Sequence, residues 1–442
     1  MTIQTHTAPV SRRHSRVCVS TLRTVTMTLS AIVLAVGLVP AASAGSWRTP
    51  QLLEGPFAVS SLPDAPLVVE NSLGHGLAAW SAASGARYAD KAPGKNWGAG
   101  RAVPGGQQSA GFIAAALGDN DFAAIAYFTV ATRYTPSKLM ICTRLTNAAF
   151  SKPLTVTSTH LASDLHAAVA PDGSITLVWS EGGAIKAAHL DAASGTWDIA
   201  ALSTPGIPAA QPALVSNEGG DVLVAWQEGA GYQAVAIHAV QRPAGGNWSA
   251  AEIVSLANGL STWNPKGGLS AAGDAAVGWL EGNTMVVARK PASGSWQAPE
   301  ALSGSQTVYY PALAMDSGGN LVAAWQVLDA NNFGAIWSSK AVAGGGWTAA
   351  TRLSGKAEDA AWPTVASARA GSFALVSWTD NASNSVRASI STGGGWTART
   401  LGTGYWSGTV PVAAGGGNAV AGWATPHGFN PNAADIMADV WR

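Results

Sequence analysis

Apolar residues in this chain gather in short runs, and turns rich in glycine, aspartate or asparagine separate the runs. In the clearest example, the turn Gly219–Asp221 leads into the apolar run Val222–Trp226. Short runs of this kind, bounded by turn residues, predict β-strands. The same turn and strand recur along the chain, and each copy ends in an aromatic residue: Trp80, Tyr127, Trp179, Trp226, Trp279, Trp325, Trp378 and Trp423. No run of helical periodicity intervenes, so the pattern predicts an all-β protein of eight repeated units.

Each unit contains four strand-like segments. In the unit taken as a model they are Pro311–Met315, Leu321–Trp325, Ala335–Ser339 and Trp347–Leu353. A second aromatic series opens the fourth segment of each unit: Trp47, Trp97, Phe150, Trp197, Trp248, Trp296, Trp347 and Trp396. Members of the first series lie 45 to 53 positions apart, and four short strands in about 40–50 residues are typical of propeller blades. We therefore predict an eight-bladed β-propeller of four-stranded antiparallel blades over residues 45–442.

The two ends of the repeat predict how the ring closes. The repeat begins with a fourth strand, Trp47–Leu53, and finishes with a third strand, Ile436–Trp441. Pairing these two completes an eighth blade and removes two exposed sheet edges. The second and third units are the least regular, because Tyr127 and Phe150 replace tryptophan there, and distortion is expected in them.

Residues 1–44 have the pattern of a secretory signal peptide. Several arginines precede the apolar segment Leu29–Val39, which is too short to span a bilayer, and Ala42–Ala44 is a small-residue cleavage site. The protein is therefore expected to be secreted or periplasmic, and no later stretch predicts a membrane span. Cys18 would leave with the leader, so Cys142 remains alone and is expected to be a buried apolar residue.

Composition argues against several classes of function. The chain has 25 basic and 25 acidic residues, and no basic surface that would indicate a nucleic-acid partner is apparent. The glycines belong to turns rather than to a phosphate-binding loop, so no cofactor is expected. His160, Asp164 and His166 form the one tight group of histidine and acid, and no further ligand lies near them in sequence. We therefore expect no metal site.

The turns before the second aromatic series carry glycine two positions ahead of tryptophan, as in Ser293–Trp296, Gly245–Trp248 and Gly394–Trp396. This layout resembles the Asp-box repeats of sialidase-like propellers, although the aspartate of that box is absent here. It is also similar to bacterial propeller lectins that bind fucose and related sugars. The resemblance implies a propeller fold and a link to carbohydrate, and it assigns no functional residue.

Aromatic residues that precede several first strands are the principal candidates for a binding site. In propellers, the loops that join the fourth strand to the next blade share a face with the loops between second and third strands, and ligands usually bind there. The candidates are Trp263, Tyr310, Trp362 and Trp406. Their faces suit the CH-rich surface of a sugar ring. Alternatively, these rings wedge between neighbouring blades.

Acidic residues follow the repeated tryptophan by two positions and form a second candidate set, Glu228, Glu281 and Asp380. We expect them either to accept hydrogen bonds from sugar hydroxyls or to cap turns. No catalytic residue is predicted. The favoured hypothesis is a carbohydrate-binding, lectin-like module for a cell-surface or polymer glycan. The alternatives are a sialidase-like glycoside hydrolase, which needs converging arginines and carboxylates, and a scaffold for protein–protein interaction.

Overall fold

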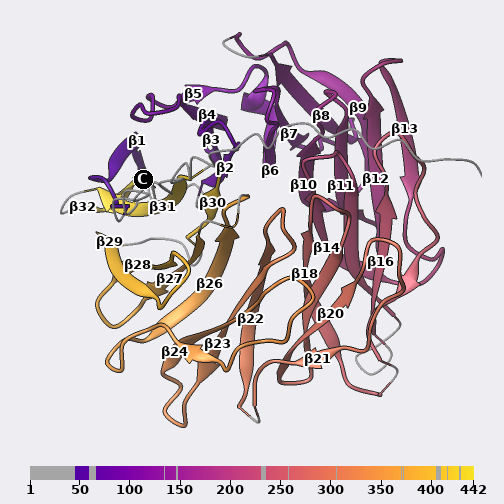
Figure 1. Cartoon of the computed structure of the whole chain (residues 1–442). Coiled ribbons are helices and arrows are strands. Elements are labelled where there is room, and N and C mark those ends of the chain that lie inside the picture. Colours follow the sequence, from indigo (N-terminus) through magenta and orange to yellow (C-terminus); the bar gives the residue numbers. More distant parts are fainter. Residues whose placement is uncertain are drawn as a thin grey trace, which may run out of the picture. The chain divides into compact units, whose positions relative to one another are not determined.

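Each predicted unit folds into a four-stranded antiparallel sheet, and the sheets follow one another around a ring (Figure 1). The computed structural model describes residues 45–58, 66–133, 135–145, 148–229, 235–256, 258–304, 306–369, 371, 373–404, 410–415, 417–427 and 430–442. These residues belong to one unit, Gly45–Arg442. The expected leader, residues 1–44, lies outside the described residues and stays a prediction.

The blades are numbered here in chain order, and each is listed from its first strand to its fourth. Blade 1 contains β2 (Leu67–Glu70), β3 (Gly76–Ala82), β4 (Gly85–Lys91) and β5 (Arg101–Ala102), followed by the short 3₁₀ turn η2 (Gly106–Gln108). Blade 2 contains β6 (Ser109–Leu117), β7 (Ala123–Thr129), β8 (Ser137–Arg144) and β9 (Leu154–Thr159). Blade 3 contains β10 (Ala162–Val169), β11 (Ile175–Glu181), β12 (Ala184–Asp191) and β13 (Thr196–Ala201). Blade 4 contains β14 (Ala209–Ser216), β15 (Val222–Glu228), β16 (Ala236–Arg242) and β17 (Glu252–Ile253).

The remaining blades repeat this order. Blade 5 contains β18 (Thr262–Leu269), β19 (Ala275–Glu281), β20 (Thr284–Lys290) and β21 (Glu300–Ala301). Blade 6 contains β22 (Val308–Met315), β23 (Leu321–Leu328), β24 (Gly334–Ala341) and β25 (Thr351–Arg352). Blade 7 contains β26 (Ala360–Ser367), β27 (Ala374–Asp380), β28 (Ser385–Ser391) and β29 (Thr397–Thr403). Blade 8 contains β30 (Val412–Ala414), β31 (Ala419–His427), β32 (Asn430–Trp441) and β1 (Gln51–Ala58).

The N-terminal strand closes the ring as predicted. In Figure 1, β1 (indigo) lies beside β32 (yellow), and the two pair antiparallel, with Gln51 opposite Ala438. Trp47 forms a separate bridge to Trp441. The main pairing runs over 51–58 rather than the expected 47–53, and bulges after Leu52 and Glu54 shift its register, so that these eight residues pair with the shorter stretch 433–438. The predicted eight-bladed, all-β fold is confirmed, and blades 2 and 3 are both four-stranded sheets. Blade 2 shows part of the expected irregularity, because its β8–β9 pairing has a register shift in addition to the one in its first strand.

The apolar core is divided among the interfaces between blades. Each interface holds one cluster of buried side chains, and each cluster includes the second-strand aromatic residue of one blade together with side chains of the preceding blade. Trp279 of β19, for example, packs against Leu223 of β15. The repeated tryptophans are fully or almost fully buried. The sequence repeat therefore marks the contacts that join blades, because a single blade cannot bury its own apolar faces.

Most first strands contain a β-bulge at the same place. In β14, the pairing with β15 skips two residues, Gln211 and Pro212, which lie opposite the single residue Trp226. The first strands of blades 3 and 5–7 bulge in the same way opposite Trp179, Trp279, Trp325 and Trp378. In four of these strands the second bulged residue is proline, which has no N–H to donate to the ladder. The bulge therefore accommodates proline without loss of a sheet hydrogen bond.

Candidate functional site

The bulges place one residue of each affected first strand in the left-handed region of backbone space. These residues are Asp164, Gln211, Asn264, Tyr310 and Trp362, with φ values of 51°, 54°, 59°, 48° and 53°. We call this set the bulge arc. First strands of adjacent blades contact one another around the ring, and we call the space that they surround the central channel. The bulge lies near the start of each first strand, so the arc follows one end of this channel, the channel mouth, over blades 3–7. Blade 2 has Gly111, with φ of 98°, at its bulge.

Two members of the bulge arc have side chains that are unusual for this conformation. A left-handed backbone costs a residue with a Cβ about 1–2 kcal/mol, and glycine, asparagine or aspartate normally occupies it. Tyr310 and Trp362 occupy it in adjacent blades. Their ring centroids lie 6.1 Å apart in an edge-to-face arrangement. Tyr310 is 43% exposed and Trp362 is half-buried, so the pair forms an accessible aromatic surface.

The structure places the four predicted aromatic residues differently from one another. Tyr310 and Trp362 lie within first strands rather than in the loops before them, because each strand continues past its bulge. Trp263 precedes the bulge residue Asn264 by one position, so it is not equivalent to Tyr310, and it packs against the apolar cluster between blades 5 and 6. Trp406 lies outside the described residues. The structure therefore brings together two of the four candidates.

A cavity of about 390 Å³ opens beside the arc, along the first strands of blades 3–5. Its polar lining comes from Asp164, His166, Gln211, Asn264 and Lys266. The backbone N–H of Asn264 donates to Gln211 Oε1 at 2.8 Å, and Lys266 Nζ donates to Asn264 Oδ1, also at 2.8 Å. The first bond connects blade 4 to blade 5, the second lies within blade 5, and together they fix the positions of both amide side chains.

Burial changes the titration of two groups in the cavity. It lowers the pKa of His166 to about 4, and the nearby Lys266 charge acts in the same direction while Asp164 opposes it. Burial also lowers the pKa of Lys266 to about 8. At neutral pH His166 is therefore uncharged, and most Lys266 side chains carry a proton. Shifted groups gathered in one cavity are typical of functional sites.

The predicted acidic residues bond to the framework of the protein. Glu228 is 4% exposed and accepts hydrogen bonds from Trp226 Nε1 at 2.7 Å and from the backbone N–H of Thr204. Burial raises the pKa of Glu228, but these hydrogen bonds outweigh it and leave the pKa below its ordinary value. Glu281 accepts from Trp279 Nε1 at 3.2 Å and from Asn258 Nδ2 at 2.5 Å.

Asp380 is bonded in a similar way, because it accepts from the backbone N–H groups of Asp359 and Ala382 and from the Ser383 hydroxyl. The observed contacts of Glu228, Glu281 and Asp380 are hydrogen bonds to loops and, for the two glutamates, to buried tryptophans. Ligand binding by these three residues stays a prediction. Cys142 is also buried, and its pKa is raised to about 12 by burial.

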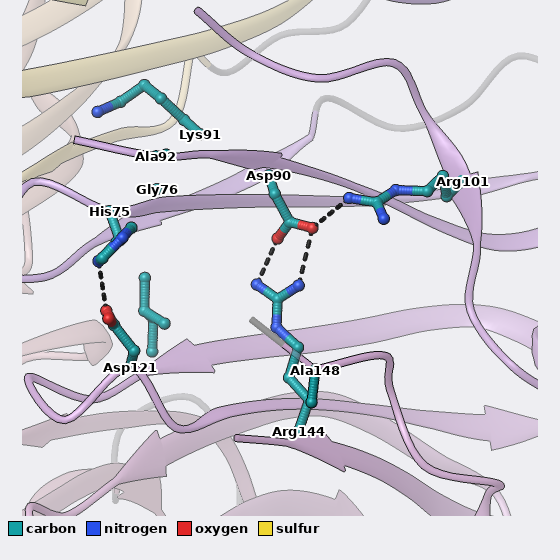
Figure 2. A pocket seen from close by; sticks show the side chains of 10 residues that line it. His75, Gly76, Asp90, Lys91, Ala92, Arg101, Asp121, Arg144 and Ala148 are labelled. Carbon is teal, nitrogen blue, oxygen red and sulfur yellow. Dashed lines mark hydrogen bonds and ion pairs between the residues drawn. The ribbon is translucent and has the colours of Figure 1, made fainter. Parts of the chain in front are cut away.

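Figure 2 shows a second cavity, of about 270 Å³, between blades 1 and 2. Arg101 and Arg144 both bind Asp90, and His75 Nδ1 lies 2.5 Å from Asp121 Oδ1. The two guanidinium groups therefore converge on a carboxylate of the protein itself. A sialidase requires arginines directed at the carboxylate of its substrate. Arg101 and Arg144 do not form such a cluster, because both bind Asp90.

The channel end opposite the arc is crossed by an ion pair. Arg369, in the turn between the first two strands of blade 7, binds Asp119 in the corresponding turn of blade 2. These blades are not neighbours in the ring, so the pair spans the channel. The backbone carbonyl of Arg369 also accepts from the N–H of Ser317 in blade 6. These contacts narrow this end, and the candidate site lies at the other.

Two features of the site were not predicted from the sequence. Asn264 and Lys266 were missed because their contacts depend on the bulge. The available signal was that Lys266 is the one charged residue in the segment Thr262–Leu269. His160, Asp164 and His166 do not converge as a group, since the His160 backbone binds Glu181 while His166 lines the cavity. Within the described residues, no group of three or more His, Cys, Asp or Glu side chains is arranged to hold a metal ion.

Comparison with known proteins identifies the fold and no family. No family model matches the chain, and no curated protein matches it. Among solved structures, the polysaccharide lyase Uly1 has a TM-score of 0.50 and 10% identity, over 88% of this chain and 99% of that one. A catalytically inactive virginiamycin B lyase from Staphylococcus aureus has a TM-score of 0.44 and 11% identity, over 75% and 95% of the two chains.

A sialidase, Hadza microbial sialidase Hz136, is also among the similar structures. Its TM-score is 0.40 and its identity 12%, over 70% of this chain and 73% of that one. At these identities the likeness is one of fold, which is that of a β-propeller. No helix in the described ranges is both long and apolar enough to cross a bilayer.

Proposed function

We propose that this protein is a secreted or periplasmic β-propeller that binds carbohydrate at the channel mouth. The observation that carries the proposal is the aromatic pair Tyr310–Trp362, held on two left-handed bulge residues of adjacent blades. Backbone strain at bulky residues persists where the surroundings impose it, and it is concentrated at functional sites. An accessible aromatic pair offers the surface on which a sugar ring stacks.

The neighbouring members of the arc support a carbohydrate ligand. Gln211 and Asn264 occupy the equivalent positions in the two preceding blades and carry amide groups. Sugar rings combine an apolar face with hydroxyl groups, and a site for them combines aromatic surface with fixed polar side chains. The order of the arc, from amides to aromatics, supplies both along one continuous edge of the channel.

The contacts of the acidic residues favour binding over hydrolysis. A glycosidase of the two-carboxylate type needs a pair of acids about 5–10 Å apart beside the substrate. Glu228 and Glu281 are buried, and each bonds to the tryptophan of its own strand. Arg101 and Arg144 bind Asp90. None of these groups is directed at the aromatic pair, so the proposal assigns no catalytic residue.

A glycan array tests the proposal with the purified protein, with the variants Tyr310→Ala and Trp362→Ala, and with Trp197→Ala as the control. Trp197 is also half-buried, but it lies on the fourth strand β13. We expect the protein to bind at least one glycan class, and both site variants to lose about tenfold or more in affinity. The control should bind normally. Binding that survives in folded site variants would contradict the site, and binding to no glycan would favour a protein partner instead.

A further inference from the structure

The cavity beside the arc presents hydrogen-bond donors. Lys266 Nζ can only donate, so the Asn264 atom that it contacts at 2.8 Å must be the amide oxygen. The backbone N–H of Asn264 likewise requires the contacting atom of Gln211 to be oxygen. The acceptor half of each amide is therefore used inside the protein. The remaining halves, Asn264 Nδ2 and Gln211 Nε2, are donors that a ligand can use.

Lys266 adds a positive charge to these donors. Its side chain is half-buried and lines the cavity. Within the described residues, Lys266 forms no ion pair with a carboxylate, and Asn264 Oδ1 is the one protein acceptor of its Nζ. An ammonium group carries three N–H donors, so two remain for a ligand. A charge removed from water without a counter-ion favours an anion beside it.

The other ionisable groups of the cavity do not neutralise Lys266. His166 is uncharged at neutral pH, since its pKa is lowered to about 4 chiefly by burial. Asp164 is exposed at the rim and accepts a hydrogen bond from Ser163 Oγ at 3.1 Å. Water screens a carboxylate at the rim more than it screens a group deeper in the wall. The innermost part of the cavity is thus positive and rich in donors.

We propose that the cavity formed by Gln211, Asn264 and Lys266 binds a negatively charged substituent, a carboxylate or a sulfate ester, of an acidic oligosaccharide. This inference rests on the proposed function, because the sugar ring of that oligosaccharide stacks on Tyr310 and Trp362. The bulge arc places Asn264 and Tyr310 at equivalent positions of neighbouring blades. One saccharide chain lying along the arc therefore contacts both the aromatic pair and the donors.

The test is a calorimetric titration of the protein at low ionic strength with two pairs of probes. The first pair is oligogalacturonate and its methyl ester, and the second is sulfated and unmodified dextran oligomers. We expect at least one charged probe to bind about tenfold or more tighter than its uncharged counterpart, because hydrogen bonds to charged groups are the stronger ones. Whichever pair shows the difference identifies the carboxylate or the sulfate as the recognised group.

Variants locate the effect. Lys266→Gln should abolish the preference for charge, so that the charged probe and its uncharged counterpart bind with equal affinity. Asn264→Asp should also abolish this preference, because the new carboxylate pairs with Lys266, and it replaces Lys266→Gln as the test if that variant does not fold. Asp164→Asn should leave the preference intact or increase it.

A preference that survives both Lys266→Gln and Asn264→Asp would overturn the inference. Equal affinity for charged and uncharged probes would overturn it while leaving the aromatic site standing. Binding of no saccharide would overturn this inference and the proposed function together.

Discussion

At the scale of single residues, the hydrogen bond between a repeated tryptophan and the acid two positions later explains why both residues recur. In β11, β15 and β19 the indole N–H donates to the carboxylate that ends the same strand. In blade 7 the indole of Trp378 donates instead to Glu358. Blade 1 has Ala82 in the acid's position, and Trp80 Nε1 has no partner within the described residues. The acid therefore strengthens a blade where it is present, and the fold tolerates its absence, since Ala82, Thr129, Val327 and Thr425 occupy this position in blades 1, 2, 6 and 8.

We predict that Glu228→Ala lowers the free energy of unfolding by about 1–3 kcal/mol, because it leaves the buried Trp226 N–H and the Thr204 N–H unpaired. Glu218→Ala is the matched control, since Glu218 is an exposed residue of the same blade and should change stability by less than about 0.5 kcal/mol. Denaturant titration measures both. Equal effects would contradict the structural role of Glu228. If Glu228 instead bound the glycan, Glu228→Ala would weaken binding at unchanged stability.

At the scale of elements, the bulge in the first strand connects the structural repeat to the candidate site. The strand needs two residues opposite each buried tryptophan, and the first of them must adopt a positive φ. In blades 3–7 the repeat therefore provides equivalent positions at the channel mouth, and their side chains vary while the backbone stays constant. Because the side chains can differ on the same backbone, one face of a propeller can bind different ligands without a change of fold.

The strain at the arc predicts an order of stability among variants of Tyr310. Glycine adopts the left-handed region at no steric cost, whereas alanine retains the cost of its Cβ. Tyr310→Gly should therefore be more stable than Tyr310→Ala by about 1 kcal/mol, although both lose the ring. Thermal unfolding of the two proteins tests this. The reverse order, with alanine more stable, would mean that residue 310 has a negative φ in solution.

At the scale of the whole molecule, ring closure depends on pairing the two ends of the repeat. Leu53 of β1 is 3% exposed and belongs to the cluster between blades 8 and 1, with Ile436 and Trp80. Its neighbour Leu52 points outward and is 53% exposed. If the closing strand is an integral part of the fold, removal of its buried side chain should cost as much as a core substitution elsewhere.

We predict that Leu53→Ala lowers the free energy of unfolding by about 2–5 kcal/mol. Leu52→Ala should change it by less than about 0.5 kcal/mol. Chemical denaturation monitored by tryptophan fluorescence compares the two variants. A cost for Leu53→Ala as small as that for Leu52→Ala would indicate that β1 contributes little to the ring.

The architecture was predictable from the sequence because it is carried by local, repeated signals. The turn before Val222 and the tryptophan that ends the run define a strand, and eight copies define the blades. The site was less accessible to prediction, because the bulge opposite Trp226 shifts Gln211 into the first strand. The contact between Gln211 and Asn264 joins residues 53 positions apart. The order of residues does not show such contacts, so Lys266 was missed and Trp263 was grouped with residues that it does not match.

The most direct measurement is hydrogen–deuterium exchange of the protein with and without a glycan identified on the array. Binding at the channel mouth predicts slower exchange in β22 and β26, which carry Tyr310 and Trp362. Exchange in the fourth strands, such as β13, should be unchanged. Protection confined to the cavity between blades 1 and 2, or to the outer strands, would contradict a binding site on the bulge arc.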